Sequence, residues 1–593
     1  MFSLLAELHL WNSTDVEVSS NDFGAIRQNE KKPKNDSLLE EGKWSYCEKR
    51  RGHTSLSRKN TKFKELEECL QQNRIVYSKW QTNSIFQLVF STGLIITVEI
   101  DTHTCVIERI VFDQFFVGKL ESDIIHDVLI LKSHILFALH DNMITLAHLS
   151  KPLKKREMPG KLSKSEVQIH TQELTGLLGK CKMNSNINGD LIAIWRMYNG
   201  DEVQPWTPSN RDQTHANIHI YTLTRTKLDL ICLYRTEFDP ICVTYSLLNT
   251  NILHSVEQKI SGKGVVTIEI CSYEVQKTQL SRTIVTSIPL QKQVCCHFFH
   301  SANRKLVLGC IDGSIVLFDQ GKGTTLMVKM AFIPTMITLN HDGSVILAAN
   351  EQSQLQFFDV ALNNLSVQMV GNESSTISIL DFSEYYKSRQ TLTKLLWNLK
   401  PEHPPLNSKK FTETDTVILM LYERGIFAAL KLVSNAGARS NVCELGYTPD
   451  VMIHQYLKMG QIDKAINVLL SLDWNFWGTI CLISLNRIFN HLYRQKFTSE
   501  IEGQMQMALS SFWAPVKPHC QEVIEEYEGS VKSLSRRFFH LLLRHQLFEK
   551  AFCLAIDIGD HDLFMDMNYY AWTIKDYEMA IAAKNKAIEL LKE

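Results

Sequence analysis

The chain lacks the features that most directly assign a protein to a class. Its 14 cysteines include no C-x-x-C pair, and their dispersion indicates reduced, buried thiols rather than a disulfide framework or zinc site. The uncharged run from Gln81 to Val98 is interrupted by polar residues and Gly93, which favours a hairpin over a transmembrane helix. The amino terminus, MFSLLAELHLW, has no basic start and contains Glu7. It therefore predicts no secretory signal, and we expect a cytoplasmic protein.

An excess of either charge is also missing. The chain has 63 basic and 64 acidic residues and a formal net charge of −1. The whole protein therefore has no general attraction for nucleic acid or anionic membrane, and any such contact requires a local patch. We expect no nucleic-acid partner.

Catalytic and cofactor motifs are absent as well. GKGTTL (Gly321–Leu326) and GKGVVT (Gly262–Thr267) lack the earlier glycine of a phosphate-binding loop and are interpreted as turns between strands. No G-x-S-x-G or H-E-x-x-H occurs, and His519-Cys520 has no further zinc ligands nearby. We expect no catalytic site, cofactor or metal.

What the chain does contain is a repeat. LVLGCIDGSIVLFD ends at Asp319, and VILAANEQSQLQFFD ends 40 residues later at Asp359. Gly309 matches Ala349 as the small residue of one strand, and an aromatic-Asp pair closes each copy. This period and pattern are typical of WD-repeat propellers, although Phe-Asp replaces Trp-Asp, which is absent. We assign Gly309, Asp319 and Asp359 as structural blade positions.

Weaker strand pairs extend the pattern. They are Phe86–Asp101, His134–Leu149, Gly189–Tyr198, Asn217–Tyr234 and Val265–Val275, and a last hairpin covers Thr416–Val433. Their spread suits a β-propeller of seven degenerate blades over residues 63–435. An amino-terminal strand within residues 1–12 can pair with the last hairpin and close the ring, removing an open edge.

Polar segments interrupt this pattern. Residues 13–62 have little to bury and predict a disordered loop, followed by a short helix at Lys62–Asn73; Lys151–Glu166 is interpreted as a loop between blades. Seven basic residues and one acid lie between Cys47 and Lys64. Either this is a solvated loop, or its basic residues contact anionic phospholipid; the candidates for that contact are Arg50, Arg51, Arg58 and Lys59.

After Gly446 the apolar period becomes helical. Thr448-Pro449-Asp450 is a helix start, and three similar turns surround Ala465, Ala551 and Ala580. An acid, an apolar residue and a close-packing alanine at each helix start are typical of stacked helix pairs, so residues 446–593 predict an α-helical solenoid. The aromatic run Arg536–Phe552 is interpreted as helix core. Its arginines can rim a docking surface, and the candidate partner-binding residues are Arg536, Arg537 and Arg544.

Several longer segments resemble one family. They are RRFFHLLLRHQLFEKAFCLAIDIGDHDLFMDM (Arg536–Met567), NHLYRQKFT (Asn490–Thr498), SFWAPVKP (Ser511–Pro518), PWTP (Pro205–Pro208), RTEFDP (Arg235–Pro240) and ELHLW (Glu7–Trp11). Together they resemble the Fritz family of WD-repeat planar cell polarity effectors, over essentially the whole chain.

This resemblance implies a non-enzymatic subunit of the ciliogenesis and planar polarity effector complex. Its implied partners are Inturned, Fuzzy, a Rab-like small GTPase, septins and intraflagellar transport proteins. It implies roles in ciliogenesis, in recruiting transport proteins to the ciliary base, and in septin and actin organisation. The implied locations are the basal body, the axoneme and the peripheral plasma membrane. Family members often continue beyond the helical part, so the function of a longer tail is not assigned to this chain.

Two classes of function stay open from the residues alone. The first is an assembly scaffold with one surface on the propeller and another on the solenoid. The second is a substrate receptor of a ubiquitin ligase, another common role of propellers. Co-purification separates them: Inturned and Fuzzy at fixed stoichiometry favour the scaffold, and a cullin adaptor favours the receptor.

Overall fold

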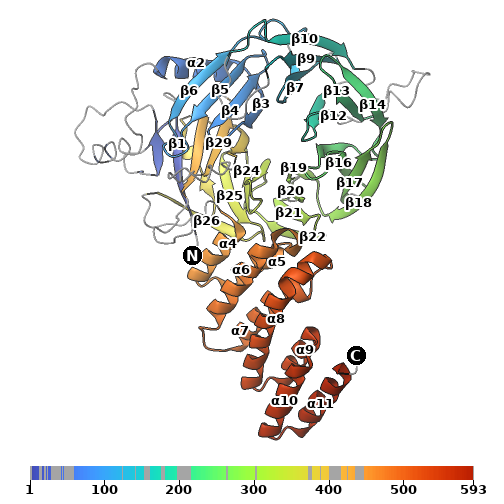
Figure 1. The fold of residues 1–593 in the computed structure, drawn as a ribbon. Helices are drawn as coiled ribbons and strands as arrows, with labels where there is room; N and C mark the ends of the chain where they lie inside the picture. The colour runs from blue at the N-terminus through green and yellow to red at the C-terminus, as the bar shows by residue number, and fades with distance from the viewer. Residues whose placement is uncertain are drawn as a thin grey trace.

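A ring of β-sheets and a row of paired helices make up the computed structural model (Figure 1). The structure describes residues 3–11, 16–18, 22, 24–28, 42, 45, 59–122, 124–140, 142–151, 161–174, 180–196, 216–261, 265–300, 304–370, 377–387, 389–399, 416–423, 425, 427–433 and 447–591. The ring is a β-propeller-like arrangement, and the helices follow it in the chain.

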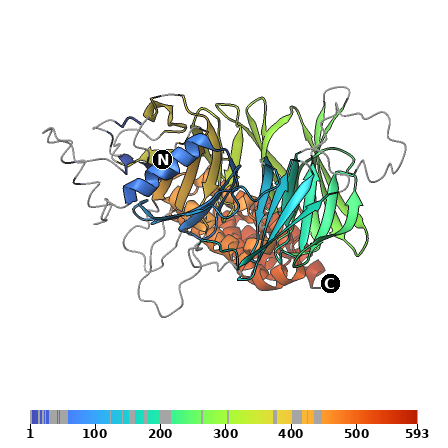
Figure 2. The same ribbon diagram turned by 90° about the horizontal axis from the view of Figure 1, so that it is seen from above.

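Five of the sheets have four antiparallel strands each. They comprise β3 (Ile75–Trp80), β4 (Ile85–Phe90), β5 (Ile95–Ile100) and β6 (Ile107–Asp113); β7 (Ile125–Ile130), β8 (His134–Leu139), β9 (Met143–Leu149) and β10 (Val167–Glu173); β11 (Cys181–Ser185), β12 (Leu191–Arg196), β13 (Ile218–Leu223) and β14 (Leu228–Tyr234); β15 (Pro240–Tyr245), β16 (Ile252–Ile260), β17 (Val266–Val275) and β18 (Leu280–Leu290); and β19 (Val294–His300), β20 (Lys305–Cys310), β21 (Ser314–Asp319) and β22 (Thr324–Lys329). Figure 2 shows the strands running across the thickness of the ring.

The sixth sheet has ten strands and contains the amino-terminal strand. Its order is β23 (Met336–Leu339), β24 (Val345–Ala349), β25 (Gln354–Asp359), β26 (Asn364–Met369), β1 (Ser3–Leu10), β30 (Phe427–Val433), β29 (Thr416–Tyr422) and β28 (Leu392–Trp397), with β2 (Ala25–Arg27) on β1 and β27 (Leu380–Asp381) on β25. β1 is parallel to β26 and antiparallel to β30. It therefore covers an edge of both neighbours.

The repeat copies form the expected hairpins. Every residue of β20 and β21 is buried, and Gly313 supplies the positive φ of 80° that the intervening turn requires. The second copy forms β24 and β25. Apolar side chains of neighbouring sheets then pack together, so the propeller core consists of layers between sheets.

Three sequence assignments are wrong in detail. Gly189–Tyr198 is not a strand pair: its described part holds the single strand β12, whose partners are β11 and β13. Val265–Val275 is not a strand pair: almost all of it is one strand, β17, whose partner β18 has mainly polar or exposed positions and so gives little hydrophobic signal. Lys151–Glu166 does not connect blades, because β9 and β10 belong to one sheet. The polar sequence of β10, VQIHTQE, concealed this fourth strand.

Among the described residues, one helix lies between β2 and β3 and eight follow β30. They are α2 (Lys59–Gln72), α4 (Pro449–Lys458), α5 (Ile462–Ser471), α6 (Trp474–Leu492), α7 (Ser499–Trp513), α8 (Gln521–Arg544), α9 (Phe548–Ile558), α10 (His561–Ile574) and α11 (Tyr577–Leu590); Ser383–Tyr385 form one 3-10 turn. The helix expected at Lys62–Asn73 is α2, which lies outside β6 at the rim (Figures 1 and 2). Within the described ranges, no helix is long and apolar enough to cross a membrane.

Buried alanines explain how the carboxy-terminal helices stack. Ala465, Ala551 and Ala580 are fully buried near the starts of α5, α9 and α11. A methyl side chain allows close approach of the next helix. The resulting row leaves the rim of the propeller beside β22 and β26 (Figure 1).

Candidate partner-binding surfaces

The end of β25 attaches the first helix of the solenoid to the propeller. Asp359 is fully buried, and its Oδ1 accepts hydrogen bonds from the backbone N–H groups of Ala361 and Asn363, both at 2.9 Å. Its Oδ2 accepts from Asn363 Nδ2 at 2.9 Å and from the Tyr456 hydroxyl of α4 at 2.8 Å. Burial raises the pKa of Asp359, and these hydrogen bonds oppose that rise. One carboxylate thus shapes its own turn and holds α4.

The matching turn after β21 contacts the solenoid at a second place. Asp319 Oδ1 accepts the Lys322 backbone N–H at 3.1 Å. The Lys322 ammonium donates to the Leu470 carbonyl in the last turn of α5. Lys517, after α7, donates to the Gln320 carbonyl at 3.1 Å. The two blades that carry the clearest repeat copies are therefore both attached to the helices.

Apolar packing continues across this junction. A single cluster of buried side chains includes Leu347 and Phe357 of the propeller together with Tyr456, Leu469 and Trp474 of the helices. Because hydrogen bonds and core packing hold both parts, their outer surfaces are presented in one fixed geometry.

The candidate arginines all lie in the second half of α8 and are exposed. Arg536 donates through Nε and Nη2 to Asp560 Oδ2, at 3.0 and 2.7 Å. The Arg537 guanidinium lies 4.7 Å from the centre of the Tyr493 ring. Arg544 lies in the last turn of α8, where positive charge complements the helix dipole. Arg536 and Arg537 therefore also hold α8 against its neighbours, whereas the Arg544 side chain makes no ion pair or ring contact with the described residues.

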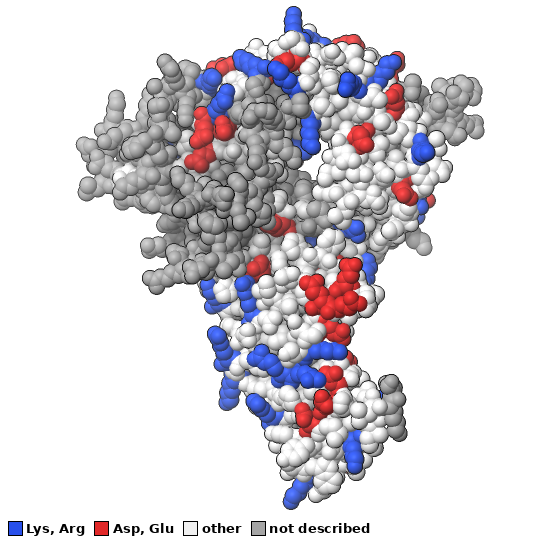
Figure 3. All heavy atoms as spheres, in the orientation of Figure 1, with Lys and Arg blue, Asp and Glu red and all other residues white. Residues whose placement is uncertain are grey.

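Charge on α8 is divided along its length. The acids Glu522, Glu525, Glu526 and Glu528 all lie in its first eight residues, whereas the basic residues Lys532, Arg536, Arg537 and Arg544 follow them. Figure 3 shows acidic and basic groups in separate patches on the helical part. Such separation orients charged partners more than it adds affinity.

Large apolar side chains are exposed along the last two helices. We call them the terminal stripe: Met565, Tyr569 and Trp572 of α10, and Tyr577, Ile581, Ile588 and Leu591 at α11 and its end. Tyr569 is 73% exposed and Ile581 is 56% exposed, and the rings of Trp572 and Tyr577 meet edge to face at 5.0 Å. From Tyr577 to Leu591 the apolar positions follow the alternating four- and three-residue intervals of a coiled-coil contact face. Lys584 occupies the middle position of this series. The sequence analysis missed this stripe, although the apolar residues on both faces of α11 were a signal for it.

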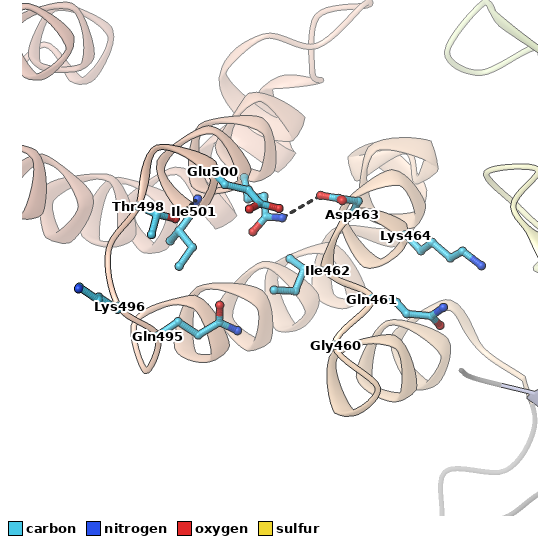
Figure 4. A pocket seen from close by; sticks show the side chains of 11 residues that line it. Gly460, Gln461, Ile462, Asp463, Lys464, Gln495, Lys496, Thr498, Glu500 and Ile501 are labelled. Atoms are coloured by element: carbon cyan, nitrogen blue, oxygen red, sulfur yellow. Dashed lines mark hydrogen bonds between the residues drawn. The ribbon is translucent and has the colours of Figure 1, made fainter.

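A groove of about 540 Å³ lies between the starts of α5 and α7. Gln504 Nε2 donates to Asp463 Oδ1 across it at 2.8 Å (Figure 4). Its other charged lining residues, Lys464, Lys496 and Glu500, mix both signs. The groove therefore favours no single charge class of ligand.

The remaining predicted residues are of two kinds. Gly309 lies in β20, where a Cβ would come within 2.5 Å of Cys296 Sγ, so its role is steric. Arg50, Arg51 and Arg58 lie outside the described residues, as does most of the segment 13–62. Lys59 is the first residue of α2. The lipid-contact assignment therefore stays a prediction.

With these surfaces in place, the chain can be compared with known proteins. The model of a family described as WD repeat-containing and planar cell polarity effector protein Fritz matches residues 36–583. The chain belongs to the Fritz family. The family resemblance in the sequence is thus confirmed, and the family's description refers to WD repeats and an effector role rather than to an enzyme activity.

Three relatives show the extent of the similarity. The chain is 34% identical to the Drosophila melanogaster Fritz protein over 613 residues, covering 100% of the chain and 64% of that protein. It is 30% identical to the human Fritz homolog, covering 99% of the chain and 79% of the homolog, and 30% identical to the mouse homolog, covering 99% and 82%. The chain therefore spans about two thirds to four fifths of the length of these Fritz proteins.

Proposed function

We propose that this Fritz-family chain is a non-enzymatic scaffold that assembles with Inturned, Fuzzy and a Rab-like small GTPase in planar cell polarity and ciliogenesis. The observation that carries the proposal is the terminal stripe. Seven large apolar side chains are exposed along two helices that pack together, and such concentrations of exposed apolar surface commonly mark an interaction site. Aromatic residues are also the side chains most enriched at binding hot spots.

The junction supports the same proposal. A scaffold must hold its docking surfaces at fixed separation, and the Asp359–Tyr456 and Lys322–Leu470 contacts fix the solenoid on the propeller. The partner identities come from the family resemblance. From the same source come recruitment of intraflagellar transport proteins at the ciliary base, septin and actin organisation, and location at the basal body, axoneme and peripheral plasma membrane.

We also propose that the propeller has seven blades. In this interpretation the ten-stranded sheet counts as two blades, one built on β23–β26 and one on β28–β30, with β1 between them. The five four-stranded sheets supply the others. A density map of the chain at side-chain resolution tests the number directly, and a ring with another number of radial sheets would contradict it.

The scaffold proposal is tested by pull-down of purified Inturned and Fuzzy with the full chain. In the test variant, Tyr569→Glu and Ile581→Glu place two charges in the terminal stripe. Both side chains are more than half exposed, so the melting temperature should stay near that of wild type. We expect recovery of the partners to fall at least tenfold, because a buried, unpaired carboxylate at an interface is costly.

The matched control puts the same charges on exposed apolar positions elsewhere. Ile284 and Met327 lie on the outer strands β18 and β22, and each is 57% exposed. The variant Ile284→Glu/Met327→Glu should keep full recovery. Equal recovery by the stripe variant and wild type would refute the stripe as the docking surface. Stoichiometric recovery of a cullin adaptor in place of Inturned and Fuzzy would favour the ubiquitin-ligase alternative.

A further inference from the structure

A pocket of about 420 Å³ opens among β3, β19, β23 and β28, which belong to three sheets of the ring. We call it the channel pocket. Its lining includes Ser78 of β3, His297 of β19, Thr335 and Met336 at β23, and Lys394 and Leu395 of β28. None of these residues takes part in the junction, the α8 surface or the terminal stripe.

The lining holds hydrogen-bond donors that the protein does not fully use. Lys394 Nζ makes one long hydrogen bond, to the Val76 carbonyl at 3.3 Å, and no described carboxylate lies within 4.0 Å of it. Ser78 Oγ is buried without a hydrogen-bond partner among the described residues. Leaving such groups without partners costs free energy, and burial accordingly lowers the pKa of Lys394.

Among the described residues, the acid that acts on Lys394 is Asp127, and its carboxylate already has hydrogen-bond partners. Asp127 is close enough to favour the charged form of Lys394. However, the Asp127 carboxylate accepts the backbone N–H groups of Met183 at 2.8 Å and Val128 at 2.9 Å. Lys182 and Arg74 add positive charge to the same region. Burial lowers the pKa of His297 to about 4, so its imidazole is neutral near pH 7 and carries an N–H donor.

We propose that the channel pocket binds a carboxylate group, presented by a glutamate side chain of a peptide segment that enters the ring. A carboxylate oxygen accepts from both the Lys394 ammonium and the Ser78 hydroxyl, which satisfies both donors. The apolar walls formed by Met336 and Leu395 suit the methylene stem of glutamate. The Asp127 charge disfavours a dianion such as phosphate relative to a single carboxylate. This proposal does not depend on which proteins the scaffold binds.

The test uses the full chain with ¹³C-labelled methionine methyl groups. Met336 lines the pocket, so its methyl signal reports occupancy even when binding is weak. The chain has 17 methionines, and the signal that is missing from the spectrum of the Met336→Leu variant is that of Met336. The ligands are the peptide acetyl-Gly-Ser-Glu-Gly-Ser-amide and its Glu→Gln counterpart. We expect a saturable shift of the Met336 signal with the glutamate peptide and none with the glutamine peptide.

Variants connect the shift to the donors. Lys394→Met should weaken binding of the glutamate peptide about 10- to 100-fold, because it removes a charged hydrogen bond. Ser78→Ala should weaken binding of the glutamate peptide about threefold to tenfold. If Lys394→Met does not fold, Ser78→Ala alone tests whether the pocket donors bind the carboxylate. The control Lys329→Met changes an exposed lysine on the outer strand β22 and should bind as wild type does.

An acetate titration separates the two sources of the carboxylate. Weaker binding of acetate than of the glutamate peptide supports a peptide ligand. Equal affinity would overturn the proposal that the carboxylate comes from a peptide, and a free carboxylate would then be the ligand. The carboxylate site itself is refuted by a Met336 signal that does not move, by equal shifts with the two peptides, or by unchanged affinity in a folded Lys394→Met or Ser78→Ala variant.

Discussion

At the scale of single residues, the repeat positions are fixed by space and by hydrogen bonding. Gly309 is the clearest case. A Cβ built on it would lie 2.5 Å from Cys296 Sγ, 2.7 Å from Pro334 Cγ and 2.9 Å from Ile337 Cδ1. Cys296 and Ile337 belong to the apolar cluster between two sheets, and Pro334 is also buried, so an added methyl group meets packed neighbours.

We therefore predict that Gly309→Ala lowers the free energy of unfolding by about 1–3 kcal/mol through overpacking. Urea denaturation with circular dichroism measures the change. The control is Gly529→Ala on the exposed side of α8, where nothing lies within 4 Å of the added methyl. It should raise stability by about 0.5–1 kcal/mol, because alanine is the better helix former. A Gly309→Ala variant as stable as wild type would show that the sheets can separate at this point.

The sequence could predict these positions but not their partners. A small residue in the second strand and an aspartate at the end of the third belong to a known repeat pattern, so Gly309, Asp319 and Asp359 were found by spacing alone. The partner of Asp359 is Tyr456, 97 residues away. No local pattern encodes that contact, because it depends on how the solenoid folds back against the ring.

At the scale of elements, the strands that could be recognised from the sequence are those whose side chains are buried. The middle strands of each sheet are nearly continuous apolar runs and were found, as in β4, β8 and β21. The outer strands β10, β18 and β22 are largely exposed and alternate weakly. Hydrophobic periodicity therefore identified hairpins and the fourth strand β14, while the exposed fourth strands β10, β18 and β22 were not found.

The amino-terminal strand is the element whose removal should matter most. Leu4, Ala6, Leu8 and Leu10 of β1 are buried, and β1 pairs with both β26 and β30. A chain lacking residues 1–11 would expose two strand edges and an apolar face, and it should melt lower and aggregate.

Complementation tests this prediction for β1. A synthetic peptide of residues 1–11 added to the shortened chain should raise its melting temperature in a concentration-dependent way, as a ligand of the folded state does. The same peptide with Leu8→Asp should have no effect, because it would bury a carboxylate. A shortened chain that is monomeric and melts like wild type would contradict the closing role of β1.

At the scale of the whole molecule, the propeller and solenoid share one interior. Residues of β24 and β25 belong to the same apolar cluster as the helices from α4 onward. The change of apolar period at Gly446 correctly suggested a change of architecture. It could not show that the core is continuous across that change, because periodicity reports on each element separately.

A shared interior predicts that the two parts unfold together. In the wild-type chain, calorimetry should give one transition that contains both parts. Tyr456→Phe removes the hydroxyl that Asp359 accepts from and should cost about 1.5–3 kcal/mol, the range for a hydrogen bond to a charged group. Adding Lys322→Met removes the bond to the Leu470 carbonyl, and the double variant should show two separated transitions.

The control Tyr577→Phe alters an exposed tyrosine far from the junction and should leave the single transition intact. Two transitions already present in wild type, or one transition in a folded double variant, would mean that the junction does not couple the propeller to the solenoid.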